Sequence, residues 1–338
     1  MIFQFNNLFN VLKFSFCAIC LLLSACAQKQ AFCPKPEKAV KNFHAQKSID
    51  QQALLTDLKR LSSREMAGRA TETRGNKLAA NYIASKFQAL NIQSYTPDYR
   101  HPFLFGSANK RQGVNLIGYI PGQNTDNRKT IVVTAHYDHL GTQGKHIFYG
   151  ADDNASGVSA MLALARYWRQ YPPLNNILFL ATDAEEDGLY GSKHFVKNPP
   201  IALEEIMLNI NLDMVARGGA KKRLYFAGTR KNKMIGELLA PHLSTARVCV
   251  RAGHETRSSL LIAGRQGPDW NNASDHAPFR KEGIPYIYFG VDVHGDYHQT
   301  SDTFENIDPE FFVNSVQTIV NFSVVLDQKL EQLSSIEN

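Results

Sequence analysis

Short apolar runs alternate along this chain with segments of helical periodicity. Each run has five to eight residues, is rich in Val, Ile, Leu, Phe and Tyr, and is bounded by Gly, Pro, Asn or Asp. Continuous apolar runs of this length are typical of strands that are buried on both faces. The runs are VNLIGYI (114–120), TIVVTAH (130–136), NILFLATD (176–183), IMLNINLD (206–213), LYFAG (224–228) and IPYIYFG (284–290).

Helical patterns lie before and between these runs. In the segment 156–171 apolar residues recur at intervals of three and four, from Val158 to Trp168. Segments 54–61 and 76–90 have the same period. Strands that alternate with helices predict an α/β fold, a three-layer α/β/α sandwich around a mixed, mostly parallel sheet.

Side chains that can bind metals stand where three of the runs end. His136 closes the run 130–136, Glu185 and Glu186 follow the run 176–183, and Asp213 closes the run 206–213. Open α/β sheets place their functional crevice outside the carboxyl ends of the strands. We therefore expect these side chains to meet at one edge of the sheet, together with two from polar loops, Asp153 and His298.

The set has the composition of a site for two divalent cations. Two imidazoles and three carboxylates, from His136, Asp153, Glu186, Asp213 and His298, are donors that suit zinc. Asp138 stands two residues after His136 and can accept the other N–H of its imidazole, which would fix the tautomer. Glu185, beside a ligand, can act as a base, so the set indicates hydrolysis by a metal-activated water.

In order and setting these motifs resemble those of the di-zinc aminopeptidase family, which also contains glutamate carboxypeptidase, glutaminyl cyclase and the transferrin receptor. The motifs are TAHYDHLG, GADDNASG, ATDAEEDGLYGS, NINLDMVA and DYHQTSDT, and residues 61–92 are similar to the family's preceding helical segment. The resemblance covers roughly residues 50–325 and implies the zinc-exopeptidase fold and two zinc ions per chain.

The family's motifs also assign roles. Asp153 would bridge the two metals, Asp213 would join His136 on one ion, and His298 would join Glu186 on the other. Glu185 would be the general base and acid for a hydroxide that bridges the metals. The resemblance further implies a cis peptide between Asp153 and Asn154, an orienting role for Asp302, and a supporting role for Asp275 and His276 in the wall of the site.

The resemblance implies an aminopeptidase that acts on peptides with a free N-terminus, and other activities stay open. A glutaminyl cyclase works with one zinc ion, and the presence of both His136 and Asp213 argues against it. Other di-zinc amidohydrolases or carboxypeptidases share the ligand set. A non-catalytic binding module is disfavoured because such members lose ligands or the base, whereas this chain has all of them.

The N-terminus predicts a lipoprotein. Residues 1–25 contain one early lysine and an apolar core too short to span a membrane, which indicates a signal peptide. Leu23-Ser24-Ala25-Cys26 resembles a bacterial lipobox, so Cys26 is the expected site of lipidation. Residues 26–48 would form the lipidated N-terminus and a flexible tether, and residues 49–330 a single catalytic domain. By analogy with Gram-negative sorting, Ala27 favours the outer membrane, with the enzyme facing the periplasm.

The cysteine content and the net charge each predict that a feature is absent. Of five cysteines, only Cys33 and Cys249 would remain after processing and lipidation, and although one disulfide is formally possible in an oxidising compartment, we predict no structural bridge between them. The net charge of +6 comes without a nucleic-acid motif or an aromatic-interleaved basic patch. We therefore expect no nucleic acid among the partners.

Overall fold

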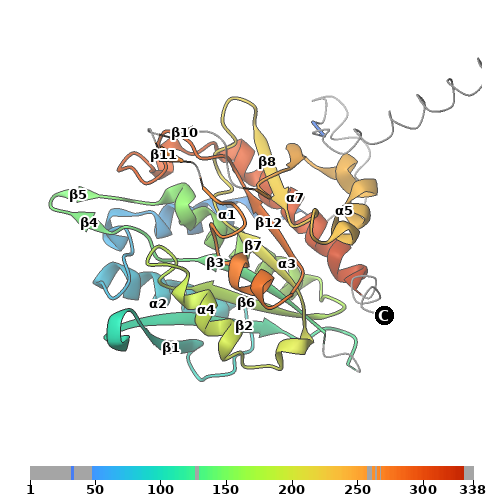
Figure 1. The fold of residues 1–338 in the computed structure, drawn as a ribbon, viewed down its shortest axis with the longest axis horizontal. Coiled ribbons are helices and arrows are strands. Elements are labelled where there is room, and N and C mark those ends of the chain that lie inside the picture. The colour runs from blue at the N-terminus through green and yellow to red at the C-terminus, as the bar shows by residue number, and fades with distance from the viewer. Residues whose placement is uncertain are drawn as a thin grey trace, which may run out of the picture. The chain divides into compact units, whose positions relative to one another are not determined.

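The computed structural model describes residues 32–33, 48–125, 129–256, 261–262, 265–266 and 268–330. Its main feature is an eight-stranded sheet with the order β1-β2-β6-β3-β7-β12-β8-β9 (Figure 1). The strands are β1 (Arg100–Phe105), β2 (Arg111–Ile120), β3 (Thr130–His136), β6 (Asn176–Thr182), β7 (Ile206–Leu212), β8 (Arg223–Ala227), β9 (Cys249–Ala252) and β12 (Tyr286–Gly290).

The directions of the strands confirm a mixed, mostly parallel sheet. Strands β6, β3, β7 and β12 are mutually parallel, and β8 is parallel to β9. The pairs β1–β2, β2–β6 and β12–β8 are antiparallel. The carboxyl ends of the four central strands consequently point to the same edge of the sheet.

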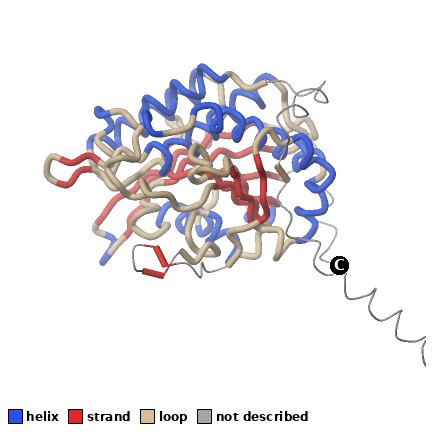
Figure 2. Tube along the Cα trace, turned by 90° about the horizontal axis from the view of Figure 1, so that it is seen from above, coloured by secondary structure: helices blue, strands red, loops and turns tan. Residues whose placement is uncertain are grey.

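Helices cover both faces of this sheet, as the three-layer prediction requires (Figure 2). On one face Ile131 and Val133 of β3 belong to a core shared with α1, α2, α3, α5 and α7, while on the other face Val132 packs in a core with Phe195 of α4 and Phe279 of α6. The helices are α1 (Gln51–Leu61), α2 (Arg74–Ala89), α3 (Gly157–Gln170), α4 (Tyr190–Lys197), α5 (Lys233–Leu239), α6 (His276–Lys281) and α7 (Pro309–Gln328).

Polar caps fix where α1 and α7 begin. The Asp50 carboxylate accepts from the backbone N–H of Ala53 at the start of α1, and Asp308 accepts from Phe311 at the start of α7. Each cap supplies an acceptor for one of the N–H groups that have no partner inside the helix, and such caps contribute about 1 kcal/mol. Within the described residues, none of these helices is long and apolar enough to cross a membrane.

Two short hairpins extend the loops. Strands β4 (Thr142–Gln143) and β5 (His146–Ile147) form one, and β10 (Leu261–Ile262) and β11 (Arg265–Gln266) form the other. The first follows β3 and the second precedes α6. The first hairpin therefore lies in the connection that leaves the carboxyl end of β3, and the second lies in the connection that leads into α6.

Cys33 and Cys249 form a disulfide, so the prediction of no structural bridge between them was wrong. Phe32 pairs with Val250 through two backbone hydrogen bonds of 2.9 and 2.8 Å, which brings the neighbouring Cys33 to Cys249 on the edge strand β9. The pairing spans 216 residues, and no local pattern in the sequence encodes it. The bond divides the predicted tether of residues 26–48; the rest of that tether, the signal segment and Cys26 lie outside the described residues.

A fully buried arginine joins the segment between α1 and α2 to the loops at the site. The Arg69 guanidinium donates to the carbonyl oxygens of Leu61, Tyr137, Tyr149 and Gly150 at 2.7–2.9 Å. Burial lowers its pKa to about 10, although nearby carboxylates raise it. The side chain therefore stays charged at neutral pH. Its hydrogen bonds hold the backbone at both ends of the loop that follows β3.

Replacing Arg69 by methionine should lower the free energy of unfolding by at least about 3 kcal/mol, because four carbonyl groups lose a buried donor. Denaturation by urea, followed by circular dichroism, measures the change. Arg64→Met is the matched control, since Arg64 is exposed. Its effect should stay within about 0.5 kcal/mol. Equal midpoints for the two variants would contradict the role assigned to Arg69.

Candidate metal centre

His136, Asp153 and Asp213 converge at the carboxyl edge of the sheet. The Nε2 atom of His136, the last residue of β3, lies 3.4 Å from Oδ1 of Asp153 and 3.5 Å from Oδ1 of Asp213. All three residues are buried, and their ligand atoms can lie within 4.8 Å of one another. This is the first of the two clusters expected from the sequence.

A second cluster shares Asp153 with the first. The Nε2 atom of His298 lies 3.1 Å from Oδ2 of Asp153 and 3.3 Å from Oε2 of Glu186. The two carboxylate oxygens of Asp153 therefore face different clusters, Oδ1 toward His136 and Oδ2 toward His298. That placement is the one expected of a carboxylate that bridges two ions.

The donors fit two zinc ions on chemical grounds. Among the predicted ligands, each cluster offers one imidazole and two carboxylates, counting Asp153 twice, and three protein ligands leave zinc a free coordination position. The Oδ1 atom of Asp213 is buried without a hydrogen-bond partner among the described residues, although it faces His136. A cation at this position would satisfy a buried carboxylate oxygen that otherwise carries an uncompensated desolvation cost.

His139 joins the second cluster and was not predicted as a ligand. Its side chain is buried, and Nδ1 lies 2.8 Å from Oε1 of Glu186. His139, Asp153 and Glu186 form a further group whose atoms could hold a metal. The only sequence signal for His139 is its position directly after the His136–Asp138 pair.

Asp138 acts on the neighbouring loop as well as on His136. The Nδ1 atom of His136 lies 3.2 Å from the backbone carbonyl of Asp138, whereas the nearest oxygen of the Asp138 carboxylate is 3.7 Å away. That carboxylate accepts from the backbone N–H groups of Glu185 and Glu186 at 3.1 and 3.2 Å. It therefore fixes the backbone of both glutamates, and the carbonyl takes the place expected for the carboxylate beside His136.

Asp302 and Asp152 hold the loop that carries Asp153. The Asp302 carboxylate accepts from the N–H groups of Asp152 and Asp153 at 3.0–3.1 Å, which agrees with the orienting role expected of it. The Asp152 carboxylate accepts from the N–H of Ala216 and contacts Nε2 of His294 at 3.0 Å. Asp152 is thus a structural neighbour, and the Asp153–Asn154 peptide is cis, as the resemblance implied.

Glu185 and Glu186 meet different surroundings although they are adjacent. Burial raises the pKa of the Glu185 carboxyl well above its ordinary value, despite the opposing effect of His136, and nearby carboxylates raise it further. Burial also raises the pKa of Glu186, but hydrogen bonds from His139 and His298 bring it down to about 2. Glu185 has the properties of a proton acceptor and donor, and Glu186 those of an anionic ligand.

A pocket opens beside both clusters. Its walls include all five predicted ligands, Glu185 and His276, together with the large apolar and aromatic side chains of Met214, Trp270, Tyr288, Val293 and Tyr297. Burial lowers the pKa of His276 to about 4, and its ring stacks on Tyr286. His276 is thus a neutral wall residue, as expected, while Asp275 is fully buried and accepts from Thr182.

Two other histidines lie near the pocket and its support. His294 contacts Asp152 and is not among the residues that line this pocket. His254 is stacked between Tyr225 and Trp270, with ring centroids 4.2 and 3.7 Å away. Trp270 connects this stack to the pocket wall. The three rings come from segments far apart in the sequence, so no local sequence pattern predicts the stack.

The fold and the ligand set define a metallopeptidase-type centre. The chain matches the description "Peptidase family M28" over residues 115–323. That match covers more than half of the chain and contains all five predicted ligands, so the chain belongs to peptidase family M28.

Known relatives agree with this assignment. Aminopeptidase YwaD of Bacillus subtilis is 32% identical over 206 residues, which are 58% of this chain but 41% of that relative. Among solved structures, a zinc aminopeptidase from Bacillus subtilis gives a TM-score of 0.64 at 18% identity, covering 82% of this chain and 95% of that one. A glutaminyl cyclase from Bacteroides thetaiotaomicron gives 0.62 at 20% identity, covering 82% and 98%. The two structures show the shared fold, and the chain spans about two fifths of the length of YwaD.

Proposed function

We propose that this chain is a lipid-anchored di-zinc aminopeptidase that releases residues from the N-termini of peptides. The observation that carries the proposal is the position of Asp153, whose two oxygens face His136 on one side and His298 on the other. His136 and Asp213 would complete the ligand set of one ion, and Glu186 and His298 would complete that of the other. Glu185 stands in the same pocket without being needed as a ligand.

Each residue at the site then has one task. When bound, the zinc ions would supply Lewis acidity and lower the pKa of water. Glu185 would take a proton from the attacking water and return it to the leaving amine, and burial raises the pKa of its carboxyl, which makes the carboxylate a stronger proton acceptor. Asp138 holds the backbone of Glu185 in place through the N–H that it accepts.

The pocket also suits a substrate with a free α-amine and an apolar first side chain. Glu185 and Asp213 offer carboxylates to an ammonium group, and charge-assisted hydrogen bonds are strong where water is partly excluded. Trp270, Tyr288 and Val293 supply apolar surface beside them. An apolar first side chain of the substrate would bury its surface against these residues.

A glutaminyl cyclase is the alternative that the shared fold keeps open. Such an enzyme needs one zinc ion, whereas His136 and Asp213 would be unused ligands in a site with a single ion at Glu186 and His298. The grouping of His136 and Asp213 with Asp153 therefore favours the hydrolase. Metal content and the products formed from an N-terminal glutamine peptide separate the two activities.

Glu185→Gln should retain about two zinc ions per chain and lose at least about a hundredfold in kcat, since general acid–base action contributes 10²–10⁴-fold. Glu186→Gln, the matched variant at the neighbouring position, should lose metal because one ligand is weakened. Elemental analysis and hydrolysis of an aminoacyl anilide measure the two effects. A Glu185→Gln variant with near-normal turnover would rule out its role as the base.

N-acetylated peptides should be cleaved far more slowly than the same peptides with a free amine. Acetylation removes the charge and leaves the carboxylate acceptors of the pocket unpaired, at a cost of about 1–3 kcal/mol, or roughly five- to a hundredfold in kcat/KM. Paired free and acetylated peptides with the same first residue provide the comparison. Similar kcat/KM values would eliminate the aminopeptidase and leave a di-zinc hydrolase of other specificity.

The lipid anchor is part of the proposal. It is supported by the apolar leader and by the lipobox-like sequence that ends at Cys26. We propose a location in the cell envelope, on the outer membrane and facing the periplasm. A disulfide between Cys33 and Cys249 is compatible with an oxidising compartment of this kind.

Cys26→Ser should block acylation of the chain, because the serine hydroxyl cannot form the thioether that carries the lipid. Metabolic labelling with a radioactive fatty acid should mark the wild-type chain and not the variant. Cys249→Ser serves as the control, since it changes a cysteine that is not expected to be acylated. Equal labelling of Cys26→Ser and the wild type would exclude Cys26 as the anchor.

A further inference from the structure

The disulfide shortens the connection between the anchor and the catalytic domain. Cys26 and Cys33 are seven positions apart in the sequence, and seven residues reach at most about 25 Å even when fully extended. Without the bond, the connection would run from Cys26 to the start of α1 at Gln51. The part of the domain around Cys249 must therefore stay close to any membrane that holds Cys26.

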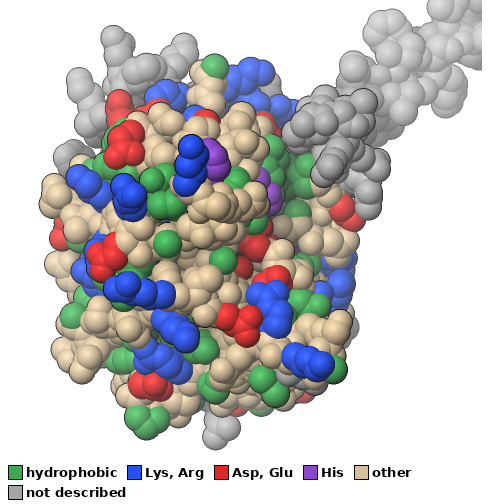
Figure 3. Space-filling view, turned by 90° about the vertical axis from the view of Figure 1, so that its left-hand side faces the viewer, with side chains coloured by type: hydrophobic (Ala, Val, Ile, Leu, Met, Phe, Trp, Pro, Cys, Tyr) green, Lys and Arg blue, Asp and Glu red, His purple; other side chains and the backbone are tan. Residues whose placement is uncertain are grey.

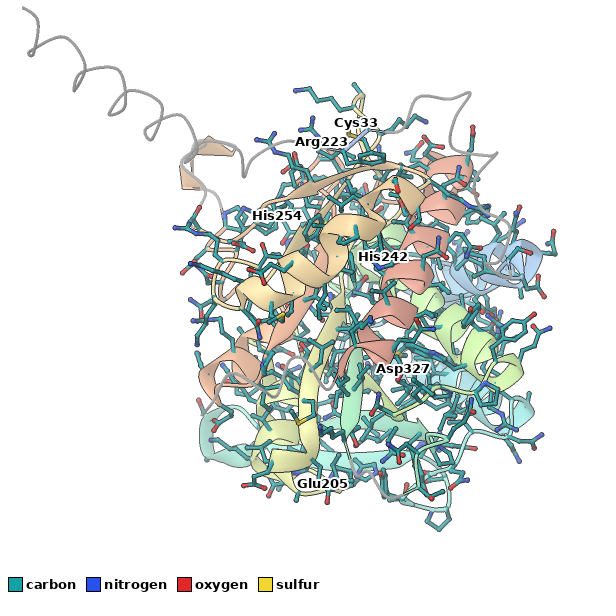
Figure 4. All side chains as sticks on the ribbon, turned by 90° about the vertical axis from the view of Figure 1, so that its right-hand side faces the viewer. Cys33, Glu205, Arg223, His242, His254 and Asp327 are labelled. Carbon is teal, nitrogen blue, oxygen red and sulfur yellow. A yellow bond between two sulfur atoms is a disulfide. The ribbon has the colours of Figure 1, made fainter. Side chains whose placement is uncertain are left out.

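The face of the sheet that carries the disulfide also carries two arginines. The register pairs Cys249 with Arg223 and Arg251 with Tyr225, so that both arginines lie on the same face as the bridge. The opposite face holds Leu224 and Val250, which are buried in the core. Cys33 and Arg223 lie close together at one end of the molecule in Figure 4, and Glu205 lies at the other end.

Further cations extend this surface, which we call the β8–β9 basic edge and define as Lys221, Lys222, Arg223, Arg247 and Arg251. Lys221 and Lys222 are exposed, and the three arginines are partly exposed. Lys222 pairs with Asp308, but Lys221, Arg247 and Arg251 have no ion-pair partner among the residues that the structure describes. On the side shown in Figure 3, in contrast, Lys and Arg side chains are interspersed with Asp and Glu.

This edge lies next to the pocket. Tyr225, between the two arginines in register, donates to Asp292, which precedes the pocket residue Val293. The ring of His254 stacks on Tyr225 and on Trp270, which also lines the pocket. A membrane in contact with the β8–β9 basic edge would therefore lie beside the opening of the active site.

We propose that the β8–β9 basic edge docks on an anionic phospholipid surface, with the disulfide holding the domain in that orientation. The proposal rests on the lipid anchor proposed above. Each Lys or Arg near an anionic surface contributes about 1 kcal/mol, which is enough for several of them to orient a domain that is already tethered. The peptides hydrolysed would then be those available at the membrane surface.

Energy transfer from two labelled positions to lipid headgroups tests the orientation. Ala220→Cys places a dye beside the basic edge, and Ala202→Cys, also exposed, places it before β7 at the opposite edge. The mature chain would have no other free thiol. The full lipidated chain is reconstituted into phosphatidylcholine vesicles with phosphatidylglycerol and a headgroup acceptor. For a domain with a radius of gyration of about 19 Å, transfer from position 220 should exceed that from position 202 by at least about twofold.

Charge and tether are tested separately. Lys221→Glu with Arg251→Glu should reduce transfer from position 220 toward that from position 202, whereas Lys231→Glu with Lys233→Glu, the same change in charge beyond the opposite end of β8, should not. High salt should act like the first pair because it screens the attraction. Cys33→Ser with Cys249→Ser should also reduce the difference, since it lengthens the tether.

The outcomes separate this inference from the proposed function. Equal transfer from both positions, or greater transfer from position 202, would overturn the orientation even if the same samples hydrolyse an aminoacyl anilide. Equal effects of the two charge pairs would overturn the role of the basic edge. Failure of the wild-type chain to enter vesicles would remove the anchor on which the inference rests, and loss of hydrolysis alone would concern only the proposed activity.

Discussion

The structure depends on burying several carboxylates together at one edge of the sheet. Asp138, Asp153 and Asp213 are buried, and Glu185 and Glu186 are partly so. Like charges at such density raise one another's pKa and are tolerated only with compensation. Backbone N–H groups compensate Asp138, histidines compensate Asp153 and Glu186, and Arg69 adds a buried positive charge nearby. The oxygen of Asp213 that lacks a donor indicates where a cation is still required.

The interactions that stabilise these buried groups also connect distant segments of the chain to the site. Arg69 from the segment before α2 binds the carbonyls of Tyr137 and Gly150, and Asp302 binds the backbone that leads into Asp153. Asp138 binds the backbone of the two glutamates across the end of β6. The geometry of the proposed ligands is therefore set by residues outside the two clusters, as is common where outer-shell groups orient ligands.

Much of this arrangement could be predicted from the sequence, because strand ends and ligand positions are local signals. The six apolar runs became six central strands, and the ligands at their ends met as expected. Two edge strands had no such signal: β1 contains Pro102 and alternates exposed with buried residues, and β9 is only four residues long. The disulfide, the stack of His254 on Trp270 and the four carbonyls around Arg69 join segments far apart in the chain, which periodicity cannot reveal. His139 was missed because one histidine beside a stronger motif looks like a loop residue.

The pair Glu185–Glu186 shows why residue type alone could not settle the division of roles. Both backbones are held by the same Asp138 carboxylate, yet the two side chains point into different surroundings. Two histidines face Glu186 and keep it anionic, whereas Glu185 is surrounded mainly by other carboxylates and by low-dielectric protein, which favour its protonated form. A carboxylate that must bind a cation needs the first setting, and one that must accept and then release a proton needs the second. The turn after β6 supplies both settings within two residues, so that one short motif can provide both the ligand and the base that we propose for this pocket.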